Sequence, residues 1–212
     1  MALKKRKIKK SKIVFIALFI VLVLFLVYFF YFKKSEKKVV APQVEVIDSI
    51  DKFNYELNDN ETEYYNSLFD LLKNLLSSDN YDEEEYAVLI GKLFLADFYD
   101  LNSKVMKSDV GGTQFVYSDY RNDFELGAID TVYSNVQSNV YGDRKQSLPV
   151  VKSIDKVDVS SDSFEYNYDI DYDAYSITFK INYEQELGYP SNVKLILIHN
   201  NDKLEIAKMV TL

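Results

Sequence analysis

Residues 164–183 read FEYNYDIDYDAYSITFKINY, and this stretch decides what kind of domain the chain builds. Apolar and aromatic side chains occupy the even positions up to Tyr172 and the odd positions from Tyr175 onward. A period of two is typical of β-strands with one buried face. The change of parity predicts a turn or a β-bulge near residues 173–174.

Strand signals continue on both sides of this stretch. Upstream, Val157 and Val159 alternate with acidic residues, as on a half-exposed strand. Downstream, residues 188–192 read GYPSN and predict a loop. Two more strands are expected at 193–199 and 204–212, joined by a tight turn. Together these segments predict a curved antiparallel sheet in the C-terminal half of the chain.

Helix signals precede the sheet. Asn60 stands three residues before Glu63, which predicts a capping box and a first amphipathic helix. Asp82, followed by three glutamates, predicts the start of a second amphipathic helix whose apolar face extends over 86–101. A third helix is expected at 120–137. About three helices followed by an antiparallel sheet define an α+β domain.

Two shorter features complete this domain. Residues 53–57 alternate apolar with polar side chains and predict a short strand before the helices. Gly111 and Gly112 interrupt the chain at a point where we expect a positive φ angle, which glycine adopts without steric cost.

Residues 13–32 read IVFIALFIVLVLFLVYFFYF, without a charge, glycine or proline. A helix of this length spans roughly 30 Å, the thickness of the hydrocarbon core of a bilayer. Seven cations and no acid precede it, which predicts that the N-terminus stays in the cytoplasm. A cleaved signal peptide is the alternative. A retained anchor is favoured because the apolar run is long and no small-residue cleavage site follows it.

This topology divides the chain into four parts. We expect a basic cytoplasmic tail at 1–12, a transmembrane helix at 13–32, a linker at 33–50 and an extracytoplasmic α+β domain at 51–212. The protein is then a single-pass protein of the cell membrane. After residue 38 the chain has fourteen cations against thirty-two acids, a formal charge of −18. Nucleic acid is therefore not an expected partner, because its phosphates would be repelled.

The candidate chemical groups are few. The chain has no cysteine, which excludes disulfides, thiolate chemistry and attachment of lipid to a cysteine. His199 is its one histidine, and no nucleophile motif or second zinc ligand accompanies it. We therefore interpret His199 as a structural residue beside the turn that follows it.

Acidic residues gather in two places without forming a recognisable site. Asp169, Asp171 and Asp173 have the spacing that opens an EF-hand loop, but Ala174 replaces its glycine and Lys180 its final glutamate. A solvated strand face explains this spacing better, and weak binding of a divalent cation stays open. The second place is a helix that carries Asp97 and Asp100, which we interpret as solvated surface acids. We therefore assign no catalytic, cofactor-binding or metal-binding residue.

The order of elements resembles a known fold. Residues 92–101, KLFLADFYDL, are similar to the aromatic second helix of the nuclear-transport-factor superfamily, and residues 151–157, VKSIDKV, to its first long strand. Behind one transmembrane helix, this cone-shaped fold resembles the bitopic assembly component of type IV secretion and conjugation machines. The chain departs from that family at 143–146, where DRKQ replaces an Asn-Pro turn. The stretch 97–112 is also similar to uncharacterised single-span membrane proteins of Gram-positive-type bacteria, which implies no activity.

Two hypotheses of function follow. The first is a non-enzymatic extracytoplasmic domain that binds protein partners, not identified by the sequence, in a bacterial envelope machine. Conjugation or type IV secretion is the machine that the resemblance implies. The second is a small-ligand or enzymatic domain of the cone superfamily acting on an envelope substrate. It requires a polar cavity between the helix at 86–101 and the sheet.

Overall fold

A computed structural model describes residues 18–28 and 44–212. The chain divides after Val40 into two compact units. Residues 18–28 are helical and lie within the expected span 13–32, whose remaining residues lie outside the described ranges, as does the expected tail 1–12. Within 18–28 and 44–212, no helix is both long enough and apolar enough to cross a membrane.

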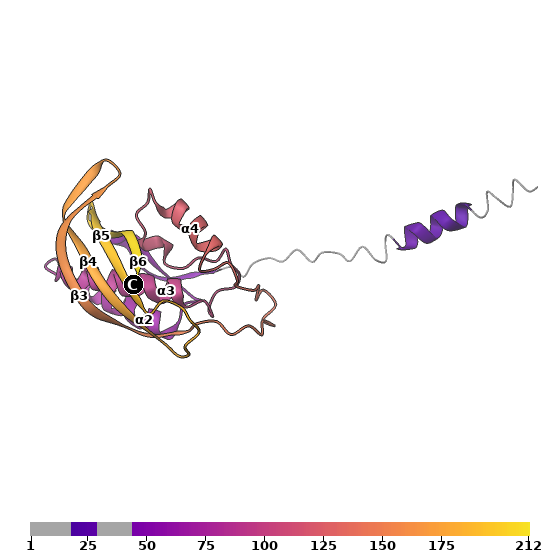
Figure 1. Ribbon diagram of the computed structural model, residues 1–212, viewed down its shortest axis with the longest axis horizontal. Helices are drawn as coiled ribbons and strands as arrows, with labels where there is room; N and C mark the ends of the chain where they lie inside the picture. The colour runs from indigo at the N-terminus through magenta and orange to yellow at the C-terminus, as the bar shows by residue number, and fades with distance from the viewer. Residues whose placement is uncertain (1–17, 29–43) are drawn as a thin grey trace, which may run out of the picture. The chain divides into compact units, whose positions relative to one another are not determined.

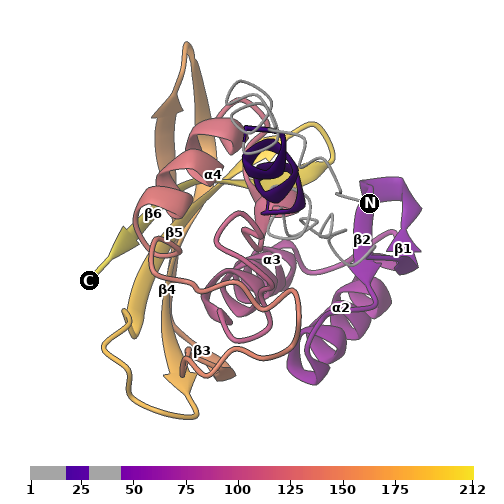
Figure 2. The same cartoon turned by 90° about the vertical axis from the view of Figure 1, so that its right-hand side faces the viewer.

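The second unit is an α+β domain, as the sequence predicts. Three α-helices precede a four-stranded antiparallel sheet of order β3-β4-β5-β6, and β1 and β2 form a separate pair. The sheet bends around α3 (Figure 1), and α4 lies on the same side of the sheet as α3 (Figure 2). The elements are β1 (Val46–Ile50), η1 (Asp51–Phe53), β2 (Tyr55–Asn58), α2 (Glu63–Leu76), α3 (Glu83–Tyr99), η2 (Thr113–Phe115), α4 (Arg121–Asp130), β3 (Val151–Tyr166), β4 (Asp169–Tyr183), β5 (Asn192–Asn200) and β6 (Lys203–Thr211).

The folded domain begins earlier than the expected linker allows. Residues 46–50, placed in the linker 33–50, form β1 and pair antiparallel with β2. The strand expected at 53–57 begins two residues later, because Asn54 adopts a left-handed conformation with φ of +49° and turns the chain. Only the last residue of β1 is buried, so β1 has no apolar pattern that sequence reasoning could use.

The start of α2 differs from the prediction and that of α3 agrees with it. The cap of α2 is Thr62, whose Oγ1 accepts a hydrogen bond from the backbone N of Tyr65 at 3.1 Å. The prediction that Asn60 caps this helix is therefore wrong, because the cap lies two residues later. Threonine, like asparagine, is a favoured capping residue. Asp82 caps α3 as predicted and accepts from the backbone N–H groups of Glu84 and Glu85.

The third helix is shorter than predicted. It ends at Asp130 instead of continuing to residue 137. The following turn brings Tyr133 into the core, where its hydroxyl donates a hydrogen bond to the backbone oxygen of Phe98 at 2.7 Å. This buried tertiary contact overrides the helical spacing of the sequence.

α3 is the centre of the domain. It packs against α2 and against β3, β4 and β6, so it is buried on nearly all sides instead of being amphipathic as expected. Gly91 lies against the sheet, where an added Cβ atom would come within 2.5 Å of the ring of Phe179. The space between α3 and the sheet is therefore filled by side chains at this point.

The β3–β4 hairpin extends beyond its neighbour in the sheet. Its turn lies at residues 167–168, where Asn167 has a φ of +49°. The irregularity predicted near 173–174 is a β-bulge, because Phe164 pairs with Asp171 whereas Asp162 pairs with Ala174. β4 pairs with β5 only between Tyr175 and Lys180, so the hairpin end (residues 161–174) projects past β5 (Figure 1).

Candidate functional site

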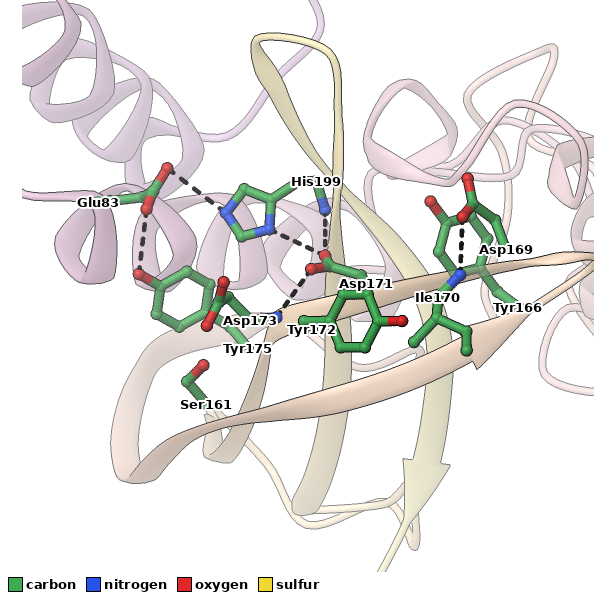
Figure 3. Close-up of a pocket in the computed structure, with 10 residues that line it drawn as sticks. All are labelled: Glu83, Ser161, Tyr166, Asp169, Ile170, Asp171, Tyr172, Asp173, Tyr175 and His199. Atoms are coloured by element: carbon green, nitrogen blue, oxygen red, sulfur yellow. Dashed lines mark hydrogen bonds and ion pairs between the residues drawn. The ribbon is translucent and has the colours of Figure 1, made fainter.

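A hollow of about 660 Å³, here called the hairpin hollow, lies at the base of the projecting hairpin end (Figure 3). Its walls come from three elements that are distant in the sequence: the first turn of α3, the bulged part of the hairpin and the end of β5. The residues that line it are Glu83, Ser161, Tyr166, Asp169, Ile170, Asp171, Tyr172, Asp173, Tyr175 and His199.

His199 connects the elements around the hollow. Its Nδ1 lies 2.9 Å from Oδ2 of Asp171, and its backbone N donates to the same oxygen at 2.6 Å. Its Nε2 lies 3.5 Å from Oε1 of Glu83 (Figure 3). His199 stands near the end of β5, before the turn at 201–202, as we expected, and it also links β5 to β4 and to α3. Sequence reasoning missed this link because the bulge in β4 brings Asp171 to it.

The carboxylate of Asp171 accepts most of its hydrogen bonds from the protein itself. Burial raises its pKa, but hydrogen bonds from the backbone N of His199 and of Asp173, together with the contact of the His199 side chain, hold the pKa below its ordinary value. Its side chain is 8% exposed. Asp171 is therefore an anion at neutral pH with a structural role.

The remaining carboxylates of the hollow have no strong cationic partner. Within the described part of the chain, the ion pairs that involve the hollow are those of His199, and no lysine or arginine pairs with Glu83, Asp169 or Asp173. Burial, and then the charge of Glu83, raise the pKa of Tyr175, whose hydroxyl donates to Oε2 of Glu83 at 3.4 Å. The hollow is therefore negatively charged and partly aromatic.

These acids do not form a metal site in the part of the chain that is described. No group of three or more histidine, cysteine, aspartate or glutamate residues there is arranged to hold a metal ion. The bulge explains why. It separates Asp173 from the regular alternation of the strand, while the carboxylate of Asp171 turns toward His199 (Figure 3).

A second polar cluster lies at the C-terminal end of α3. The prediction that Asp97 and Asp100 are solvated is wrong, since both residues are buried. Asp97 pairs with Lys104 and accepts a hydrogen bond from the backbone N of Gly112 at 2.5 Å. Asp100 accepts from the backbone N of Val151 at 3.0 Å. Both carboxylates thus hold later segments of the chain against α3.

The two glycines are explained by this cluster. Gly112 has a φ of +76°, as predicted for this point. Gly111 has a different reason: an added Cβ atom would lie 2.3 Å from the backbone oxygen of Asp97. The glycines therefore let the backbone approach a buried carboxylate closely.

A smaller cavity of about 310 Å³, here called the loop pocket, opens beside this cluster. Glu61, Lys104 and Gln114 are among the residues that line it. Burial, and then the negative charge of Asp97, raise the pKa of Glu61 to about 8. Glu61 is therefore mostly protonated at neutral pH.

Comparison of the chain with family models, with curated proteins and with solved structures finds no match. The described features of the chain are thus the α+β fold, the hairpin hollow and the loop pocket.

Proposed function

We propose that this chain is a single-pass membrane protein whose extracytoplasmic domain binds protein partners in a bacterial envelope machine, without catalysing a reaction. The apolar stretch 13–32 and the seven cations before it support the anchor and its orientation. The resemblance to the bitopic assembly component of type IV secretion and conjugation machines favours that kind of machine.

The exposed aromatic end of the β3–β4 hairpin is the observation that carries the proposal. Tyr168 is fully exposed, Tyr172 is 73% exposed and Ile170 is 43% exposed, all within five residues of one another. Large apolar groups gathered on a projecting element are costly in water, and tyrosine is enriched at protein interfaces. Such a surface is typical of a domain that contacts another protein.

The hairpin end is also held in place, which favours binding. The rings of Tyr117 and Tyr166 make an edge contact with centroids 5.4 Å apart. The backbone N of Asn167 donates to the hydroxyl of Tyr120 at 3.1 Å, and its side chain donates to Asp119. An ordered surface loses less conformational entropy when a partner binds.

The alternative function, a domain that binds or converts a small envelope ligand, is favoured by one feature, the loop pocket. Its Glu61 has a raised pKa, and such groups cluster at functional sites. The pocket lies at the end of α3, however, and the space between α3 and the sheet is filled at Gly91. The projecting hairpin therefore supports partner binding better.

In-cell photo-crosslinking tests the proposal. The crosslinking residue p-benzoylphenylalanine replaces Tyr168 or Tyr172 in the full-length protein, and the adducts are identified by mass spectrometry. The control replaces Tyr141, which is 68% exposed and lies outside the hairpin. We expect discrete protein adducts from the two hairpin positions and none from Tyr141. Equal adducts at all three positions, or none at the hairpin, would contradict the proposal.

A further inference from the structure

The hairpin end has a chemical character that narrows the class of partner. Its exposed residue Tyr172 lines a hollow that contains four carboxylates and no lysine or arginine, and the exposed Tyr168 lies at the hairpin turn, one residue before Asp169 of that hollow. The ring of His199 is already engaged by Asp171. The apolar surface and the unbalanced charge therefore occur at the same place.

Two carboxylates of the hairpin lie where a ligand can reach them. Asp169 and Asp173 are exposed and line the hollow, whereas Asp171 is occupied by His199 and by the backbone. Tyr172 comes from the strand segment between Asp171 and Asp173, and its ring lies at the hollow (Figure 3). A cation that enters can thus meet carboxylate oxygens and the face of an aromatic ring, which attracts cations through its quadrupole.

We infer that the hairpin end docks a basic segment of a protein partner, with a lysine or arginine side chain of that segment entering the hairpin hollow. This inference rests on the proposed function, because it names the partner chemistry of the same surface. Charge complementarity decides the occupant: the folded side of the chain carries a formal charge of −18, and this surface adds tyrosines to carboxylates. An acidic partner would be repelled, and a purely apolar one would leave the carboxylates desolvated and unpaired.

Arginine suits this hollow particularly well. Its planar guanidinium can stack on a tyrosine ring and still present a fork of donors to carboxylates. Lysine satisfies the charge but provides neither the planar stack nor the bidentate contact. The inference therefore predicts that arginine-containing segments bind more tightly than lysine-containing segments of equal charge.

The test measures peptide binding to the full-length protein in nanodiscs of zwitterionic lipid, which do not attract basic peptides. The probe is a fluorescent eight-residue peptide that alternates arginine with glycine, followed by fluorescence anisotropy. We expect the double variant Asp169→Asn/Asp173→Asn to weaken binding by about ten-fold. The control Asp130→Asn/Asp143→Asn removes the same charge from exposed positions outside the hairpin, and we expect a change below about two-fold.

The single variant Tyr172→Ala provides a second measurement if the double variant does not fold, and it should also weaken binding. Equal weakening by the hollow variant and its control would overturn the inference, since binding would then follow net charge alone. A second peptide has lysine in place of each arginine. Equal affinity for the two peptides, together with an unaffected Tyr172→Ala variant, would also overturn the inference. If crosslinking from position 168 still captures a protein partner, either of these results would overturn the inference alone and would not contradict the proposed function. Hollow-specific peptide binding without partner capture would show that the hollow binds basic segments, but it would count against the proposed function and against a protein partner as the occupant.

Discussion

At the scale of single residues, the buried pair of Asp97 and Lys104 shows how partners far along the chain decide the role of a side chain. Burial lowers the pKa of Lys104, but the charge and hydrogen bond of Asp97, together with the charges of Tyr133 and Glu61, hold that pKa above its ordinary value. Removing one partner of a buried pair is costly, because the other charge stays buried without compensation. Asp97 therefore fastens the loop that carries Lys104 and Gly112 to α3.

Glu61 lines the loop pocket together with this pair, and its raised pKa makes the stability of the fold depend on pH. Its pKa is raised to about 8, so the folded protein keeps a proton that the unfolded chain releases near pH 4.3. This contribution to the free energy of unfolding is fully present below about pH 4 and is lost as the pH rises to about 8. We expect Glu61→Gln to flatten the decline in stability between pH 5 and pH 8.5.

Urea unfolding of the full-length protein at several pH values checks this expectation. Glu186→Gln, at an exposed position, is the matched control and should retain the pH dependence of the wild type. Parallel curves for the wild type and Glu61→Gln would show that Glu61 ionises freely in the folded protein.

At the scale of elements, the close contact of α3 with the sheet depends on a residue without a side chain. An added Cβ at Gly91 would meet two ring carbons of Phe179 at 2.5 and 2.6 Å, and Phe179 is itself completely buried. The sequence shows a glycine inside a helix, where it costs about 1 kcal/mol relative to alanine. Only the packing shows why this position must stay small.

The glycines of α3 and α4 therefore form a matched pair for alanine substitution. Gly91→Ala should lower the free energy of unfolding by about 1–2 kcal/mol, since overpacking exceeds the gain in helix propensity. Gly127→Ala, where no atom lies within 4 Å of the added Cβ, should raise it by about 0.5–1 kcal/mol. Both values follow from denaturant unfolding curves. A stabilised Gly91→Ala variant would mean that Phe179 can move away from α3.

At the scale of the whole molecule, the proposed topology places the folded domain outside the cell. The natural chain contains no cysteine, so a single introduced cysteine reports its own location. We expect Asp143→Cys to react with a membrane-impermeant maleimide on intact cells, and Ser11→Cys to react only after lysis. The opposite pattern would reverse the proposed orientation, and labelling of both positions only after lysis would contradict an extracytoplasmic domain.

The sequence by itself determined the α+β class, the cap of α3, the positive φ of Gly112 and the irregularity near residue 173. These features depend on local physics: the period of side chains, hydrogen bonds from a cap and the steric limits of the backbone. The burial of Asp97, the inward turn of Tyr133 and the placing of Glu83 beside His199 were decided only by the tertiary structure. Each of these depends on residues between 35 and 116 positions apart or on a loop that closes over α3, and no local pattern records which distant groups will meet.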